Sequence, residues 1–262
     1  MDPQLKARFT ERWERYFPGA ELPLAYAYAE DPGDAEPSPV SDEFRCMVAA
    51  LNPVRAGHSR CFDLDRIACP GGRRYTGFSQ SLMPGIEHFL SCGIPGRLEG
   101  ERYKKSPELA AEFLKTGPAL QAPARWLVFK RWDHLGECDA PAAVLFFAPP
   151  DVLAGLFTLA NYDEPGLDAV RAPFCAGCGS LVLYPWLENL SEHPRCILGM
   201  FDPSARPCMP AGVLSFAAPW RKFVRMVENM EESFLVTPTW EVIRKRVRKE
   251  GKAVLPESGE SR

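Results

Sequence analysis

The chain has 262 residues, of which 46% are hydrophobic and 25% charged, the composition of an ordinary globular protein with one sizeable core. Its net charge of −3 gives no electrostatic basis for binding nucleic acid or an anionic membrane surface, so neither is expected as a partner. No apolar run reaches the roughly 18–20 residues that span a bilayer, and the charged first residues lack the apolar core of a signal peptide. We therefore expect a cytoplasmic protein.

The first part of the chain is predicted to hold a helix, a strand and an exposed loop. The helix covers residues 4–17, where large apolar side chains recur at every fourth position on one face: Leu5, Phe9, Trp13 and Phe17. A strand is predicted over residues 22–28, and the acidic, proline-rich residues 30–41 are expected to form a loop. Residues 44–51 are apolar at helical spacing, which predicts a second helix.

Two later helices have sequence signals at their ends. A helix is predicted over residues 106–115, because Ser106 can cap it and a proline and an acid follow in its first turn. A last helix is predicted to begin at Thr237 and to end before Gly251. Its basic end, residues 244–249, is explained by the favourable interaction of cations with a helix C-terminus rather than by nucleic-acid binding.

Two segments, residues 127–164 and 196–232, resemble each other at an offset of 69 residues. Within them, residues 144–150 and 213–219 share five identities in seven positions. Each segment has the pattern of two apolar strands followed by a helix. We predict an α+β fold in which these two strand–strand–helix units, related by approximate two-fold symmetry, form one sheet. The N-terminal helical and loop region carries Cys-Gly turns.

The chain is predicted to form a single α+β domain over residues 1–250. In it, residues 1–120 are expected to pack on the tandem repeat of residues 121–250. Residues 251–262 are predicted to be a flexible tail.

Nine cysteines, an odd number, argue against a disulfide framework and for reduced thiols. Cys175 and Cys178 form a CxxC pair, a spacing that suits a metal ion or a redox pair, but no second pair completes a zinc ribbon. Four thiols on separate segments are candidates for a shared zinc or iron–sulfur site: Cys46, Cys69, Cys92 and Cys178. Burial of single cysteines in the core is the alternative. The remaining four are expected elsewhere: Cys61, Cys138, Cys196 and Cys208.

Arginines beside rigid turns are candidates for binding an anionic ligand. Arg73 and Arg74 follow two consecutive glycines, whose backbone amides can approach a ligand closely. Arg206 lies between prolines in the turn that begins at Asp202, and its planar guanidinium suits a carboxylate or a phosphate. Arg102 completes the candidate set, which is expected to face a cleft between the repeats. The alternative is a set of plain turns with solvated side chains.

Several short segments together carry a family resemblance: residues 44–46, 68–72, 89–96, 100–103, 177–180, 198–206 and 232–240. Through them the chain resembles the uncharacterised ArCR family (domain of unknown function 169) over about residues 40–247. The resemblance implies that Cys178, in Gly-Cys-Gly, is the shared cysteine and that Cys175 is an additional one. It therefore favours the dispersed set of thiols over the CxxC pair. The family has no assigned activity, so the resemblance implies positions and no mechanism.

These patterns favour a cysteine-lined site that binds a metal ion or an iron–sulfur cluster in redox or cofactor metabolism. The alternative is a small-molecule binding module, in which the arginines take an anionic ligand and the cysteines pack. A third interpretation is a thiol-dependent enzyme with Cys178 as its nucleophile, although no histidine is placed in the sequence to activate it. The four histidines form no HExxH motif and no i, i+4 pair, so a histidine–zinc hydrolase is not expected.

Overall fold

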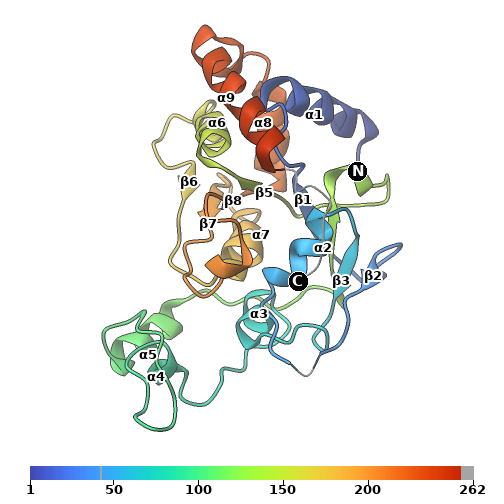
Figure 1. Cartoon of the computed structure of the whole chain (residues 1–262). Helices are drawn as coiled ribbons and strands as arrows, with labels where there is room; N and C mark the ends of the chain where they lie inside the picture. Colours follow the sequence, from blue (N-terminus) through green and yellow to red (C-terminus); the bar gives the residue numbers. More distant parts are fainter. Residues whose placement is uncertain (42, 255–262) are drawn as a thin grey trace.

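A computed structural model describes residues 1–41 and 43–254, which form a mixed α+β fold around one sheet (Figure 1). In these residues the sheet has eight strands: β1 (Leu24–Ala29), β2 (Glu36–Pro37), β3 (Arg60–Phe62), β4 (Trp126–Arg131), β5 (Ala143–Ala148), β6 (Val170–Arg171), β7 (Cys196–Gly199) and β8 (Leu214–Pro219). Their order is β2-β3-β4-β1-β5-β8-β7-β6. The edge strands β2 and β6 each run parallel to their neighbours, β3 and β7. All other neighbouring strands are antiparallel. The predicted α+β class is confirmed.

The strands β5 and β8 are the fifth and sixth strands of the sheet, away from both edges, and pair antiparallel along their full length. Successive side chains of a strand point to opposite faces of a sheet. The side chains of β5 accordingly alternate between two buried clusters, with Val144, Phe146 and Ala148 in one and Ala143, Leu145 and Phe147 in the other. Both faces of the sheet therefore need to be covered.

Helices of the described chain cover one face of the sheet: α1 (Pro3–Tyr16), α6 (Pro150–Asn161), α8 (Trp220–Asn229) and α9 (Pro238–Val254) (Figure 1). Aromatic rings fill the core beneath them. The ring of Phe146 lies 5.1–6.4 Å, centroid to centroid, from four others: Phe9, Trp13, Phe216 and Phe223. The helix predicted over residues 4–17 is confirmed, and its apolar stripe is buried.

The other face carries shorter helices: α2 (Asn52–Arg55), α3 (Pro70–Tyr75) and α7 (Tyr184–Glu188). A π-helical turn, Gly179–Leu183, leads into α7 and packs on the sheet through its apolar side chains. Short 3₁₀ turns occur at Ala49–Leu51, Trp132–His134, Arg206–Cys208 and Phe234–Val236. Across the described ranges, no helix has both the length and the apolar character of a membrane span.

Residues 79–119 leave this body and form a separate small unit, here called the α4–α5 lobe (Figure 1). It contains α4 (Ile86–Phe89) and α5 (Pro107–Thr116), which pack on each other. The ends of the lobe are held together at a neck, where the Ala122 amide donates to the Gly77 carbonyl at 2.9 Å. None of the described lobe residues belongs to the three buried clusters of the body. The lobe is thus attached through its neck rather than through the main core.

The two predicted strand–strand–helix segments correspond to β4–β5–α6 and β7–β8–α8. All four strands lie in one sheet, and α6 and α8 each follow directly from a central strand and pack on the same face. The segments differ before that point, because β7 pairs with β8 whereas β1 lies between β4 and β5. The approximate two-fold relation between the units stays a prediction.

Two local expectations differ from the structure. Of residues 44–51, expected as a helix, only the 3₁₀ turn at Ala49–Leu51 is helical. The last helix continues through Gly251 to Val254 instead of ending before the glycine. A single glycine costs a helix only about 1 kcal/mol, so it does not have to end one. Residues 255–262 of the predicted tail lie outside the described part of the chain.

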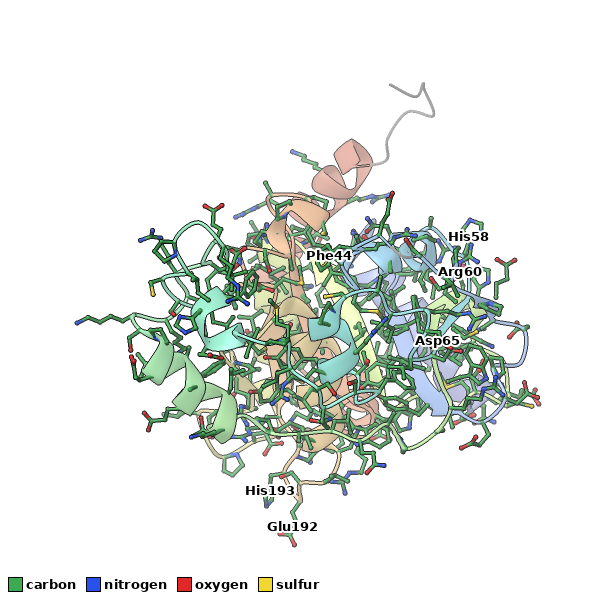
Figure 2. All side chains as sticks on the ribbon, turned by 90° about the horizontal axis from the view of Figure 1, so that it is seen from below. Phe44, His58, Arg60, Asp65, Glu192 and His193 are labelled. Atoms are coloured by element: carbon green, nitrogen blue, oxygen red, sulfur yellow. The ribbon has the colours of Figure 1, made fainter. Side chains whose placement is uncertain are left out.

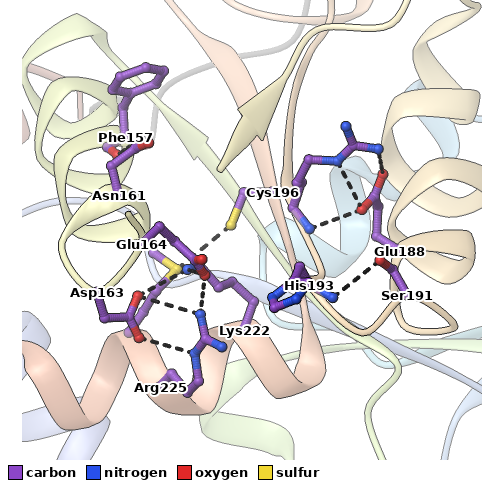
Figure 3. Close-up of polar contacts among 12 residues, drawn as sticks. Phe157, Asn161, Asp163, Glu164, Glu188, Ser191, His193, Cys196, Lys222 and Arg225 are labelled. Atoms are coloured by element: carbon purple, nitrogen blue, oxygen red, sulfur yellow. Dashed lines mark hydrogen bonds and ion pairs between the residues drawn. The ribbon is translucent and has the colours of Figure 1, made fainter. Parts of the chain in front are cut away.

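Lys222 in α8 is a fully buried cation that ties α8 to the segment after α6 (Figure 3). Its ammonium lies 3.0 Å from a carboxylate oxygen of Asp163 and 2.6 Å from one of Glu164. Arg225 pairs with the same two carboxylates. Burial alone would raise the pKa of both acids, but the hydrogen bonds and charge of Lys222 outweigh it and lower both pKa values. The folded state therefore holds this cluster ionised.

Replacing Lys222 by alanine leaves two partly buried carboxylates with Arg225 alone. We expect Lys222→Ala to lower the free energy of unfolding by about 3 kcal/mol in urea denaturation at pH 7, the cost of breaking a buried ion pair. Glu228→Ala, at an exposed position of the same helix, is the control and should change it by less than about 0.5 kcal/mol.

The loss of stability caused by Lys222→Ala should also depend on pH. Folding lowers the pKa of Asp163 and Glu164 from ordinary values of 3.8 and 4.5. Their stabilising contribution is therefore present above those values and is lost as the pH falls through the lower folded values. The difference between wild type and Lys222→Ala should shrink below about pH 4. A difference that stays constant down to pH 2 would contradict this account.

Candidate functional site

A cavity of about 590 Å³ lies between the α4–α5 lobe and the body of the protein. The lobe contributes residues of α4, α5 and the connection between them. The body contributes three loops and α3, namely residues 44–48, 69–75, 173–180 and 199–205. In Figure 2 the lobe stands beside α3, and Phe44 lies near α3 on the body. The site is therefore built from segments that are distant in the sequence and meet only in the folded chain.

The wall of the cavity is mostly apolar and rich in aromatic side chains: Phe44, Tyr75, Phe89, Tyr103, Phe113, Phe174 and Phe201. Three of these are unusually exposed for phenylalanine, with exposed fractions of 74% for Phe44, 56% for Phe174 and 55% for Phe201. Exposed apolar groups that gather at one concave surface mark sites of ligand or protein binding.

Four thiols line the cavity: Cys46, Cys69, Cys175 and Cys178. Cys69 caps α3, where its sulfur accepts a hydrogen bond from the Gly72 amide at 3.4 Å. The two glycines that were expected in an anion-binding loop, Gly71 and Gly72, therefore lie inside this short helix. Cys178 is buried at the start of the π-helical turn. The structure thus brings three of the four predicted thiols, and Cys175, to one cavity.

Cys92, the fourth member of the predicted set, is exposed in the turn after α4 and does not line the cavity. It belongs to the lobe, and its thiol donates to the neighbouring Gly93 carbonyl at 3.5 Å. Within residues 1–41 and 43–254, no group of three or more His, Cys, Asp or Glu side chains is placed to hold a metal ion.

Burial raises the pKa of three thiols of the cavity, Cys69, Cys175 and Cys178, and so keeps them protonated. It raises the pKa of Cys175 to about 12 and that of Cys178 well above its ordinary value, with the neighbouring thiols as a further cause for Cys178. The pKa of Cys69 is raised as well, again chiefly by burial. A catalytic thiol needs a lowered pKa or an adjacent base. No histidine of the described chain lines the cavity, and Figure 2 shows His58 and His193 on other sides of the molecule.

Asp202 fastens two of the loops that form the cavity wall. Its carboxylate accepts hydrogen bonds from the Gly177 amide at 3.1 Å and from the Ser204 hydroxyl at 2.8 Å. A side chain at Gly177 would come within 3.0 Å of Ala205, and one at Gly179 within 2.9 Å of the Tyr75 ring. The Gly-Cys-Gly segment therefore needs glycine on both sides of Cys178 for the loops to pack this closely.

Of the four predicted arginines, only Arg74 lines the cavity. Arg206 instead donates to the backbone carbonyls of Val213, Pro210 and Ala211, so its guanidinium joins its turn to the segment that follows. Arg73 donates to the Ile67 carbonyl. Arg102 is exposed and does not line the cavity.

One functional candidate escaped the sequence reasoning. Cys208 is not that residue, because it does not line the cavity, although burial and then the nearby Cys46 thiol raise its pKa. Lys104 of the lobe lines the cavity, with its ammonium 4.4 Å from the ring centroid of Phe113 and 4.3 Å from that of Phe174. The only sequence signal for it is a short basic run before a helix, which does not show that residues 104 and 174 meet.

Comparison with known proteins identifies the chain only at the level of a family. No curated protein and no solved structure is detectably similar to it. Residues 20–229, which include the sheet, the lobe and all the loops of the cavity, match the family described as uncharacterised ArCR, as the sequence resemblance implied. With most of its length matched, the chain belongs to the uncharacterised ArCR family, a domain of unknown function.

Proposed function

We propose that the chain is a small-molecule binding protein and that its ligand occupies the cavity between the α4–α5 lobe and the body. The observation that carries this proposal is the cavity itself. Its volume of about 590 Å³ falls in the range of roughly 300–1,000 Å³ that is usual for ligand sites. Its wall combines many apolar side chains with a few polar ones, which is the usual composition of such sites.

Burial of apolar surface would supply most of the affinity. Removing a methylene group from water contributes about 0.8 kcal/mol, and the cavity offers a ligand aromatic rings and methionines such as Met47, Met83 and Met200. The protonated thiols in the cavity wall also suit an apolar ligand, because protonated cysteine behaves as a small apolar group with a weak hydrogen-bond donor. The ligand is therefore expected to have a largely apolar body.

The attachment of the lobe supports entry and release of a ligand. Because the lobe shares no buried cluster with the body in the described residues, moving it would not disrupt the main core. It touches the body across the cavity through Phe113 and Phe174, whose ring centroids are 5.5 Å apart. Separating these two rings would widen the entrance of the cavity, while the neck keeps the lobe attached to the body.

A cavity-filling substitution tests this proposal. The probe is 8-anilinonaphthalene-1-sulfonate, an amphipathic dye whose fluorescence rises on entering an apolar site. We expect saturable binding to the wild-type protein. Leu114→Trp, at a cavity-lining position of α5, should weaken it at least tenfold, which corresponds to about 1.4 kcal/mol. Leu109→Trp is the matched control, because Leu109 lies on the same helix, is 46% exposed and does not line the cavity. Equal affinity in both variants would contradict binding at this place.

A metal ion or iron–sulfur cluster at the thiols is the second candidate function. The observation that favours it is the convergence of Cys46, Cys69, Cys175 and Cys178 on one cavity. Soft cations bind thiolates, and their binding would displace the protons that burial now retains. These side chains would have to move to form a tetrahedral set, because no three of them are placed to hold a metal ion in the described residues.

Metal analysis and an absorption spectrum of anaerobically purified protein test this second candidate. It predicts about one equivalent of zinc, or iron with visible absorption, that Cys69→Ser and Cys178→Ser abolish. Cys138→Ser, at an exposed position outside the cavity, should leave the content unchanged. Protein that carries no metal in any form, and takes up none when zinc or iron is supplied anaerobically, would contradict it.

A further inference from the structure

We infer that the ligand of this cavity is an amphipathic monoanion, a single carboxylate on an apolar body, and that Lys104 binds the carboxylate. This inference rests on the proposed function and adds the chemical class of the ligand and the residue that selects it.

Lys104 is a cation with no carboxylate partner among residues 1–41 and 43–254. Its ammonium lies between the rings of Phe113 and Phe174, which both line the cavity. It is half-buried, and the ion pairs found in the described residues do not include it. Ring faces attract a cation but accept no strong hydrogen bonds, whereas an ammonium has three donors to satisfy. An anionic group inside the cavity would complete its coordination.

The position of Lys104 explains why it can select a ligand. It belongs to the lobe, whereas Phe174 belongs to the body, so the ammonium lies where the two parts meet across the cavity. The rings hold the long side chain in one arrangement before a ligand arrives. Such preorganisation lowers the entropy lost on binding.

The charges around the cavity limit the ligand to a single negative charge. Arg74 and Lys104 are offset by Glu101 and Asp202, which also line it. The Asp202 carboxylate already accepts hydrogen bonds from the backbone amides of Gly177 and Ser204. A ligand with several phosphates would share the cavity with these two carboxylates and would be repelled by them. A single carboxylate directed at Lys104 adds the smallest negative charge that an anion can bring, and the apolar wall takes the rest of the molecule.

Matched acids and amides test the inference, because each pair differs in charge and hardly in shape. The probes are decanoate with decanamide and 2-naphthoate with 2-naphthamide, measured by displacement of the fluorescent dye. We expect the wild-type protein to bind each acid at least tenfold more tightly than its amide. Lys104→Met, which keeps the apolar length of the side chain, should remove this preference and leave the affinity for the amides nearly unchanged. Lys104→Arg should retain most of the preference.

Lys105→Met is the matched control, because Lys105 is the exposed neighbour and does not line the cavity. It should keep the wild-type preference for acids. The inference is wrong if acids and amides bind the wild-type protein equally, or if Lys104→Met keeps the preference. Either result would leave the proposed ligand cavity standing. Binding of neither acid nor amide to the wild-type protein would overturn both the inference and the proposed function.

Discussion

The pairing of β5 with β8 is the constraint on which the rest of the structure depends. Both strands are almost entirely buried and mostly apolar, so each face of the sheet must be covered by other elements. On one face four helices do this with a dense aromatic core around Phe146. On the other face the cover consists of short helices and loops, and the π-helical turn after Cys178 packs directly on the strands. The connecting loops of this second face are free to form a site.

That site forms where the loops of the body meet the α4–α5 lobe, and these two parts are stabilised in different ways. The body side is rigid, since Asp202 joins two loops and glycines allow them to pack closely around Cys178. The lobe side is held by its neck and by its own internal hydrogen bonds, such as that from the Lys104 amide to the Leu90 carbonyl. A rigid wall and a separately attached cover together give an apolar cavity that a ligand can enter. The same burial raises the pKa of Cys69, Cys175 and Cys178 and so makes these thiols poor nucleophiles.

The sequence predicted those features that depend on local periodicity and composition. The stripe of α1 and the apolar runs of the central strands were sufficient to predict the helix and the strands. The glycines and prolines beside Cys69 and Cys178 suggested a shared site, and both thiols line the same cavity, although a role for them there stays a prediction. Periodicity could not show where the lobe packs, so Cys92 was grouped with thiols of the body and Lys104 was missed. Arg206 looked available because the carbonyls that it binds lie beyond its own proline-flanked turn.

Hydrogen exchange measured with and without 2-naphthoate tests the central claim most directly, namely that the lobe and the thiol-bearing loop together enclose a ligand. The account predicts slower amide exchange in two separate stretches of the bound protein, residues 86–114 of the lobe and residues 175–180 of the body. Amides in β5 and β8 should exchange slowly in both states, because these strands lie away from both edges of the sheet. Protection confined to one of the two stretches, or found only elsewhere in the chain, would contradict a cavity formed between lobe and body.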